Sequence, residues 1–217
     1  MPIVSISGDP IRSGFATSFA HPDGNITGVT VDVGVEIWGK RLQLLKETVP
    51  SASKVGFLEL RTPYMQERLQ ALQQISGRSE ISLVGVLVEE ATPSECQRAF
   101  AAVAQERPDG IMVAGTGELR PYRQLIVELV EKSSLPAIYG ARDYMEVGGL
   151  MSYEFDQGEL GRRLADDVRQ ILNRAKPGDI PIYQPTKFEL LINLKAAKLL
   201  GLTVPPSLLA LADEVLE

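Results

Sequence analysis

Four short apolar runs decide the fold of this chain: KVGFLEL (54–60), ISLVGVLV (81–88), GIMVA (110–114) and LPAIYG (135–140). Apolar residues at helical spacing fill the intervals between them and predict helices over 64–76, 94–106 and 121–132. Strands that alternate with helices in this way form βαβ units around a parallel sheet. The stretch 54–140 therefore predicts a complete, doubly wound α/β lobe with helices on both faces of its sheet.

The segments on either side of this stretch contain fewer elements. Before it the sequence predicts strands over 3–7 and 26–31 and helices over 10–19 and 36–48. After it come an extended piece over 149–155, a helix over 158–175, a strand over 187–193 and a short helix that stops at Gly201. Two strands and two helices cannot cover both faces of a parallel sheet. We therefore expect a complete lobe over 32–155 and a partial lobe with a hinge over 1–31 plus 156–217, in which 2–31 packs against 183–217.

Composition excludes several classes of function. The chain has 217 residues and a net charge of −6, without the basic patch of a nucleic-acid-binding protein. The lone cysteine, Cys96, excludes an internal disulfide, and we expect it to be a small, partly buried helix residue. His21 is the only histidine, so neither a zinc site nor a catalytic triad is expected. We predict no cofactor, no metal, no catalytic residues and no nucleic-acid partner.

Polar and aromatic residues at the ends of the predicted strands are the candidate ligand contacts. Open α/β sheets form small-molecule sites where such groups leave their strands. The predicted contacts are Gly8, Asp9, Thr62, Tyr64, Thr116, Glu118, Asp143, Tyr153 and Asp156.

Most of these positions also have a purely structural interpretation. Asp9 and Thr62 could cap helices, and Asp143 could pair with Arg142 instead of meeting a ligand ammonium group. The sequence GTG at 115–117 resembles half of a phosphate loop but lacks the lysine and the spacing of one, so a turn beside a cleft is the favoured reading.

Several longer stretches carry a family resemblance: GDPIRSGFATSFAHPDGNITGVT (8–30), LQLLKETVPSASKVGFL (42–58), RPDGIMV (107–113), LPAIYGARDYMEVGGLMSY (135–153) and the tail QPTKFELLINLKAAKLLGLTVPPSLLALADEVLE (184–217). The chain resembles the ABC-transporter substrate-binding proteins of the tryptophan/tyrosine-transport type, without most of their N-terminal lobe. The resemblance implies a type I periplasmic-binding-protein-like α/β fold with one complete, C-terminal-type lobe and a partial second lobe. It also implies a small-molecule ligand, such as an amino acid, in an interlobe cleft, an ABC permease as partner and no enzymatic activity.

Location and assembly are the last expectations. The resemblance implies a periplasmic protein, whereas MPIVSISGDP at the N-terminus is not a secretory signal, so the chain would be cytoplasmic if it were the full product. The alternative function is a cytoplasmic ligand sensor or self-associating remnant without a transport role. Apolar residues of the partial lobe, such as Ile3, Ile6 and Val29, exceed what two nearby helices cover, which predicts a two-fold homodimer.

Overall fold

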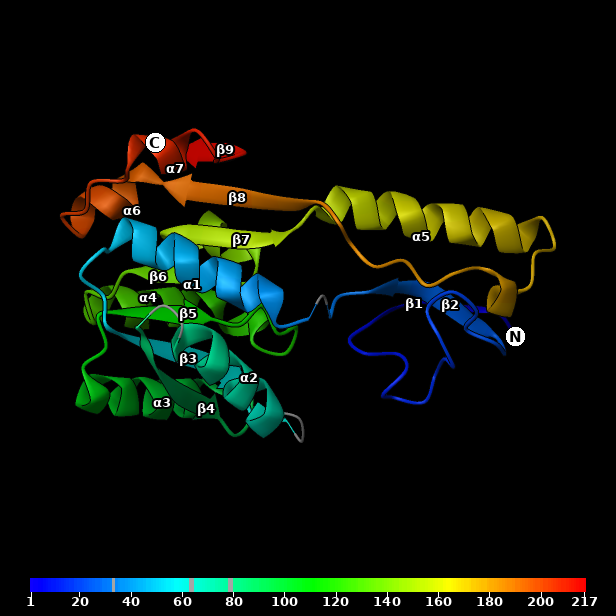
Figure 1. The fold of residues 1–217 in the computed structure, drawn as a ribbon, viewed down its shortest axis with the longest axis horizontal. Coiled ribbons are helices and arrows are strands. Elements are labelled where there is room, and N and C mark those ends of the chain that lie inside the picture. The colour runs from blue at the N-terminus through cyan, green and yellow to red at the C-terminus, as the bar shows by residue number, and fades with distance from the viewer. Residues whose placement is uncertain (33, 63–64, 78–79) are drawn as a thin grey trace. The chain divides into compact units, whose positions relative to one another are not determined.

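The computed structural model describes residues 1–32, 34–62, 65–77 and 80–217, and Figure 1 shows their fold. The chain divides into two compact units, and each has its own sheet. Unit 1 consists of Met1–Gly34 and Phe155–Phe188, and unit 2 consists of Val35–Glu154 and Glu189–Glu217. The sequence predicts a division into 32–155 and 1–31 plus 156–217, whereas in the structure the tail from Glu189 onward belongs to unit 2.

The sheet of unit 2 has the strand order β4-β3-β5-β6-β7-β8-β9. Its strands are β3 (Lys54–Leu60), β4 (Ser82–Val88), β5 (Gly110–Val113), β6 (Ala137–Tyr139), β7 (Met151–Phe155), β8 (Phe188–Asn193) and β9 (Glu214–Leu216). The pairs β3 with β4, β3 with β5, and β5 with β6 are all parallel. The parallel sheet predicted for 54–140 is therefore confirmed.

Helices cover both faces of this sheet (Figure 1). They are α1 (Glu36–Thr48), α2 (Met65–Gly77), α3 (Pro93–Glu106) and α4 (Arg123–Lys132), with the short helices α6 (Leu194–Leu199) and α7 (Pro206–Leu209) in the tail. Successive strand residues point to opposite faces. The ring of Phe57 meets Trp38 of α1 edge-on at 4.8 Å, whereas Leu58 joins the core formed with α3 and α4. Three 3-10 turns, η1 (Arg120–Tyr122), η2 (Arg142–Val147) and η3 (Pro177–Asp179), complete the helical elements in the described ranges.

The tail belongs to unit 2 from Glu189 onward. Backbone hydrogen bonds from Asn193 N to Leu150 O (2.8 Å) and from Asp156 N to Lys187 O (3.0 Å) show that β8 runs antiparallel to β7. The prediction that 183–217 packs with 2–31 is thus wrong for 189–217. The physical reason is that the apolar residues 190–192 of β8 are buried, and β8 lies between β7 and β9 in the seven-stranded sheet, where both of its edges are paired.

Unit 1 contains a two-stranded parallel sheet of β1 (Ile3–Ser7) and β2 (Ile26–Thr30). The long helix α5 (Gln157–Leu172) packs on both strands. On the edge away from β1, β2 pairs with Tyr183. The Tyr183 N–H donates to Gly28 O (2.8 Å), and its carbonyl accepts from Thr30 N (2.9 Å). Within the described part of the chain, β1 has β2 as its one strand neighbour, so its outer edge is open.

The helix predicted over 10–19 does not form, and this stretch consists of turns. The Asp9 carboxylate accepts hydrogen bonds from the backbone N–H groups of Ile11 (3.0 Å) and Arg12 (2.9 Å), which closes the first turn. Farther along, the hydroxyls of Thr17 and Ser18 donate to the carbonyl of His21. Local side-chain hydrogen bonds of this kind compete with the helical backbone pattern.

No helix in the described ranges is both long and apolar enough to cross a membrane.

Candidate functional site

The strand order of unit 2 reverses between β3 and β5. The chain passes from β3 to β4 on one side and then places β5 on the other side of β3, followed by β6 and β7. Open α/β sheets bind ligands outside the carboxyl ends of their strands at such a switch point. The groups that leave the carboxyl ends of β3 and β5 are therefore the first candidates for a binding site.

A buried carboxylate occupies this switch point. Glu59 is the penultimate residue of β3, and only 3% of its surface is exposed. One carboxylate oxygen accepts from the hydroxyl of Thr116 (2.7 Å), and the other accepts from Nη1 of Arg68 (2.9 Å). Because the Thr116 hydroxyl donates its single hydrogen to Glu59, its oxygen can only accept a hydrogen bond from any further partner.

A second buried carboxylate lies at the same edge. Glu154 is the penultimate residue of β7 and accepts from Nη2 of Arg120 (2.8 Å) and from the backbone N–H of Arg142 (2.8 Å). The Arg120 side chain is 30% exposed, and its Nε lies 3.5 Å from Asp143 Oδ2. Among the described residues this Nε has no hydrogen-bond acceptor. Glu154 and Asp143 thus hold the Arg120 guanidinium between two carboxylates at this edge.

Arg41 of α1 supports both carboxylates from inside the protein. Its guanidinium lies 4.4 Å from the centre of the Trp38 ring, and its Nε donates to Tyr153 O (2.8 Å). Burial lowers the pKa of Arg41 to about 10, although the carboxylates of Glu154 and Glu59 act in the opposite direction. Arg41 therefore stays charged at neutral pH and offsets negative charge that burial would otherwise make costly.

The structure brings some of the predicted site residues of unit 2 to this edge. Thr116 and Asp143 contact Glu59 and Arg120 there, and Tyr153 lies half-buried beside Arg41, where burial raises its pKa. Among the described residues, Thr62 and Glu118 make no side-chain hydrogen bond or ion pair with this set: Thr62 is half-buried just after β3, and Glu118 is exposed in the turn after β5. Tyr64 lies outside the described residues.

Asp143 does not pair with Arg142, which was one reading of the sequence. Its carboxylate lies near Arg120, whereas the guanidinium of Arg142 reaches Glu189 (3.4 Å) and Glu214 (3.1 Å) in the tail. Two tail strands, β8 with Glu189 and β9 with Glu214, supply the competing carboxylates.

The glycine of the GTG turn has a packing role. A β-carbon on Gly115 would collide with the carbonyl group of Gly140, because the ends of β5 and β6 approach closely. A β-carbon on Gly117 would meet nothing within 4 Å. Close strand packing therefore accounts for Gly115 without a bound phosphate.

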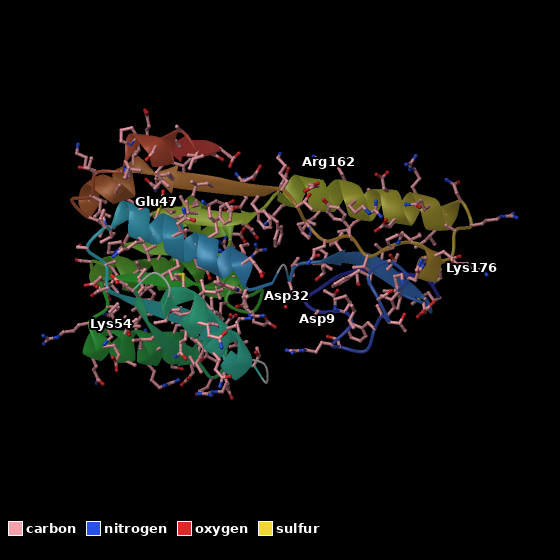
Figure 2. The ribbon with its side chains drawn as sticks, viewed as in Figure 1. Asp9, Asp32, Glu47, Lys54, Arg162 and Lys176 are labelled. Carbon is pink, nitrogen blue, oxygen red and sulfur yellow. The ribbon has the colours of Figure 1, made fainter. Side chains whose placement is uncertain are left out.

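The remaining predicted contacts lie in unit 1. Gly8 and Asp9 follow β1, and Figure 2 labels Asp9 in that loop. Asp156 caps α5 by accepting from the backbone N–H of Glu159 (3.0 Å), and it also pairs with Lys187 (3.0 Å). These hydrogen bonds, the Lys187 bond first, lower the pKa of Asp156. Ligand contact by Gly8, Asp9 and Asp156 remains a prediction.

Sequence reasoning missed Glu59, Glu154, Arg41, Arg68 and Arg120. The two carboxylates did have a signal, since each is the one acidic residue near the exit of an otherwise apolar run, in KVGFLEL and in LMSYEF. Such a residue has to be paired once the strand is buried. The arginines had none, because an arginine in a helical pattern is normally solvated.

Metal and thiol chemistry find no support in the described residues. They contain no group of three or more metal-ligating side chains. The Cys96 thiol is buried, and burial raises its pKa, which keeps it protonated and unreactive at neutral pH.

Comparison with known proteins identifies relatives along the whole chain. The family model described as "ABC transporter substrate binding protein" matches residues 1–216. A tyrosine-binding protein of Clostridioides difficile (strain R20291) is 22% identical over 196 residues, which are 89% of this chain and 55% of that protein. The chain thus spans about half the length of the curated relative that it matches.

Two solved structures share the fold over 99% of this chain. A conserved domain protein from Vibrio cholerae O1 biovar El Tor is 25% identical with a TM-score of 0.86, and 71% of its chain is covered. An ABC domain from Streptococcus pneumonia in complex with L-Trp is 24% identical with a TM-score of 0.87, and 72% of its chain is covered. These similarities confirm the expected type I periplasmic-binding-protein-like α/β fold.

Proposed function

Because the chain belongs to the ABC transporter substrate-binding protein family, we propose that it binds an aromatic amino acid and delivers it to an ABC permease. The relatives that support this ligand class are the tyrosine-binding protein and the ABC domain in complex with L-Trp. The observation that carries the proposal is the hydrogen bond between Thr116 and the buried Glu59 at the switch point of the sheet.

Each part of an amino acid has a suitable group at this edge. Arg120 offers N–H donors to the ligand carboxylate, and the hydroxyl oxygen of Thr116 accepts from the ligand ammonium. Asp143, whose side chain is 28% exposed, adds a negative charge near that ammonium. The half-buried ring of Tyr153 packs against an aromatic side chain.

The same contacts favour binding over catalysis. Both buried carboxylates, Glu59 and Glu154, already accept two hydrogen bonds each from protein donors. General acid–base catalysis needs a carboxyl group that reaches the substrate proton. Glu59 and Glu154 instead hold Thr116 and Arg120 in position, and the protein acts as a non-catalytic binder.

In this role the protein captures its ligand on the periplasmic or extracellular side of the membrane, where the family works. A thermal-shift panel tests the ligand class, since a ligand that binds only the folded state raises the unfolding midpoint. L-tryptophan and L-tyrosine raise it. Tryptamine, which lacks the carboxylate, and indole-3-propionate, which lacks the ammonium group, have much smaller effects at equal concentration. An equal shift with all four compounds contradicts the assignment of Arg120 and Thr116.

We also propose that unit 1 pairs with a second copy of the chain. Among the described residues it carries seven of the ten large apolar side chains with high exposure: Met1, Ile3, Ile6, Ile11, Phe15, Val168 and Leu172. Of the apolar residues that were expected not to be all buried, Val29 is buried. Open strand edges and exposed apolar groups are commonly covered by a partner.

The geometry of β1 specifies how the two copies would pair. Ile3 N–H and Ser7 C=O bond to the β2 side, so the alternate residues Val4 and Ile6 turn their backbone groups to the open edge. A two-fold axis at Ser5 then pairs Val4 with Ile6 of the second copy in an antiparallel ladder, with the two copies of Ser5 directly opposite each other.

A further inference from the structure

A cavity of about 220 Å³ lies in unit 2, between α4, the amino-terminal end of β7 and α6. Val130 of α4, Leu150 before β7, and Ala196 and Leu199 of α6 form apolar walls. Tyr139 and Glu131 also line the cavity. No residue of the set around Glu59 and Glu154 lines the cavity, so it is separate from the candidate amino-acid site.

The local sequence explains why this space is not filled. The helix α6 has only six residues, whereas α4, on the other side of the cavity, has ten. The connection before β7 contains Gly148, whose φ of +102° favours glycine and which contributes no side chain. A β-carbon on Gly148 would lie 3.4 Å from Glu131 Oε1, so the Glu131 carboxylate lies close to the backbone of Gly148.

The lining combines apolar surface with one charge. Glu131 is its only charged residue, and within the described part of the chain no hydrogen bond or ion pair engages its carboxylate. Leu199 keeps 79% of its surface exposed beside the opening. The neighbouring lysines Lys132 and Lys198 belong to the same two helices but do not line the cavity.

We propose that this pocket is a second binding site, for a small organic cation with an apolar body, such as an arylalkylamine. An apolar cavity of about 150 Å³ is known to hold one benzene molecule, so the larger pocket accommodates one aromatic ring with a short arm. The ring packs against Val130, Leu150 and Leu199, and the ammonium group lies beside Glu131. This inference does not depend on the proposed amino-acid site.

The size of the charge effect follows from the exposure of Glu131. An ion pair near solvent contributes about 0.2–1 kcal/mol, which corresponds to at most about fivefold in affinity. The apolar contacts therefore supply most of the affinity, and the carboxylate selects a cation over a neutral or anionic compound of the same size.

The test is an NMR titration of the full chain with phenethylamine, 2-phenylethanol and phenylacetate. Phenethylamine shifts the backbone amides of α4 and α6, binds about three- to fivefold more tightly than 2-phenylethanol, and phenylacetate binds most weakly. Shifts confined to other elements, equal affinity of the three compounds, or no saturable shift with phenethylamine overturns the proposal.

Two variants locate the ligand, and a third is the control. Glu131→Gln removes the charge and brings the affinity for phenethylamine down to that for 2-phenylethanol. Ala196→Leu fills the pocket from a helical position and reduces binding of both compounds at least tenfold. Glu128→Gln makes the same charge change on α4 outside the lining and leaves both affinities unchanged. If Glu131→Gln has the same phenethylamine affinity as the unmodified chain, the pocket is not a cation site, whatever the outcome of Ala196→Leu.

Discussion

The hydroxyl of Thr116 donates a 2.7 Å hydrogen bond to the buried carboxylate of Glu59, across the point where the strand order of unit 2 reverses. This bond fixes the direction of the hydroxyl and leaves its oxygen as an acceptor. It is also one of the hydrogen bonds that the buried carboxylate receives from other side chains, beside that from Arg68. The proposed ligand recognition and the local stability of the edge are therefore linked through one side chain.

Replacing this hydroxyl tests its role in recognition. Thr116→Val keeps the size of the side chain but removes the acceptor for the ligand ammonium, and it leaves Glu59 with one partner fewer. A lost hydrogen bond to a charged group costs about 1.5 kcal/mol or more, so calorimetry should show the affinity for L-tryptophan falling about tenfold. Thr116→Ser keeps the hydroxyl and binds within about threefold of the unmodified chain. Equal affinity in Thr116→Val and the unmodified chain removes Thr116 from the site.

The close approach of β5 and β6 predicts a large difference between two neighbouring glycines. Gly115→Ala places a methyl group against the carbonyl group of Gly140, and an overpacked site of this kind costs about 1–3 kcal/mol in the free energy of unfolding. Gly117→Ala meets open space and changes it by less than about 0.5 kcal/mol. Urea unfolding of both variants measures the difference. Similar values for the two would show that the strand ends are not packed as described.

Asp167 makes the stability of unit 1 depend on pH. This residue of α5 is fully buried, neither carboxylate oxygen has a hydrogen-bond partner in the described residues, and Arg163 Nε lies 3.3 Å away. Burial raises the pKa of Asp167, although Arg163 acts against that effect. The folded state therefore holds the proton more tightly than the unfolded state, whose pKa is about 3.9. The free energy of unfolding therefore decreases as the pH rises from the unfolded-state pKa of Asp167 to its higher folded-state pKa.

Asp167→Asn removes the destabilisation that comes from burying the ionised Asp167 carboxylate. The variant should have a higher unfolding midpoint than the unmodified chain at pH 7, and the difference should vanish below about pH 3.9. Arg163 keeps other contacts, since it also donates to Pro181 O and lies over the ring of Tyr183. The matched control is Asp166→Asn, which makes the same change at an exposed position of the same helix and has little effect. A lower midpoint for Asp167→Asn at pH 7 would contradict this account of the buried carboxylate.

The proposed dimer predicts a specific disulfide. If two copies of β1 pair about an axis at Ser5, the opposed α-carbons lie about 4.5–5.5 Å apart, which is within disulfide range. Ser5→Cys should then form a covalent dimer on mild oxidation, visible on non-reducing gels. In Ser7→Cys the equivalent atoms are about 13 Å apart and should not be linked. The native Cys96 is buried and does not interfere. A monomeric mass in sedimentation, or equal cross-linking of both variants, would rule out this pairing.

The regular part of the fold could be predicted from the sequence. The strand predicted over 54–60 matches β3, and the helix predicted over 36–48 matches α1, because apolar periodicity and glycine or proline stops define them locally. The helix predicted over 10–19 was wrong because side-chain hydrogen bonds such as those of Asp9 decide that stretch. The tail strand was misplaced because its pairing with β7 is a long-range contact that local periodicity does not encode.

The candidate site could be predicted only in part. Thr116 and Asp143 lie at the predicted edge because parallel strands bring their carboxyl ends together, and their contact with a ligand stays a prediction. Arg41 and Arg68 could not be predicted. Arg41 meets the backbone of Tyr153 only because of the sheet topology, which the local sequence does not encode. Arg68 meets Glu59 only because of the orientation of α2, which the sequence does not specify. Glu59 was recognisable as an acidic residue in an apolar strand, but its hydroxyl and guanidinium partners follow only from the fold.

Calorimetric titration of the chain with L-tryptophan tests the central claim most directly. The account predicts saturable binding of one ligand per chain, with tryptamine and indole-3-propionate each at least tenfold weaker, because Arg120 and Thr116 recognise the carboxylate and the ammonium group separately. Saturable binding that is equally strong for all three compounds, or no saturable heat with L-tryptophan or L-tyrosine at millimolar concentration, would contradict the proposed amino-acid site.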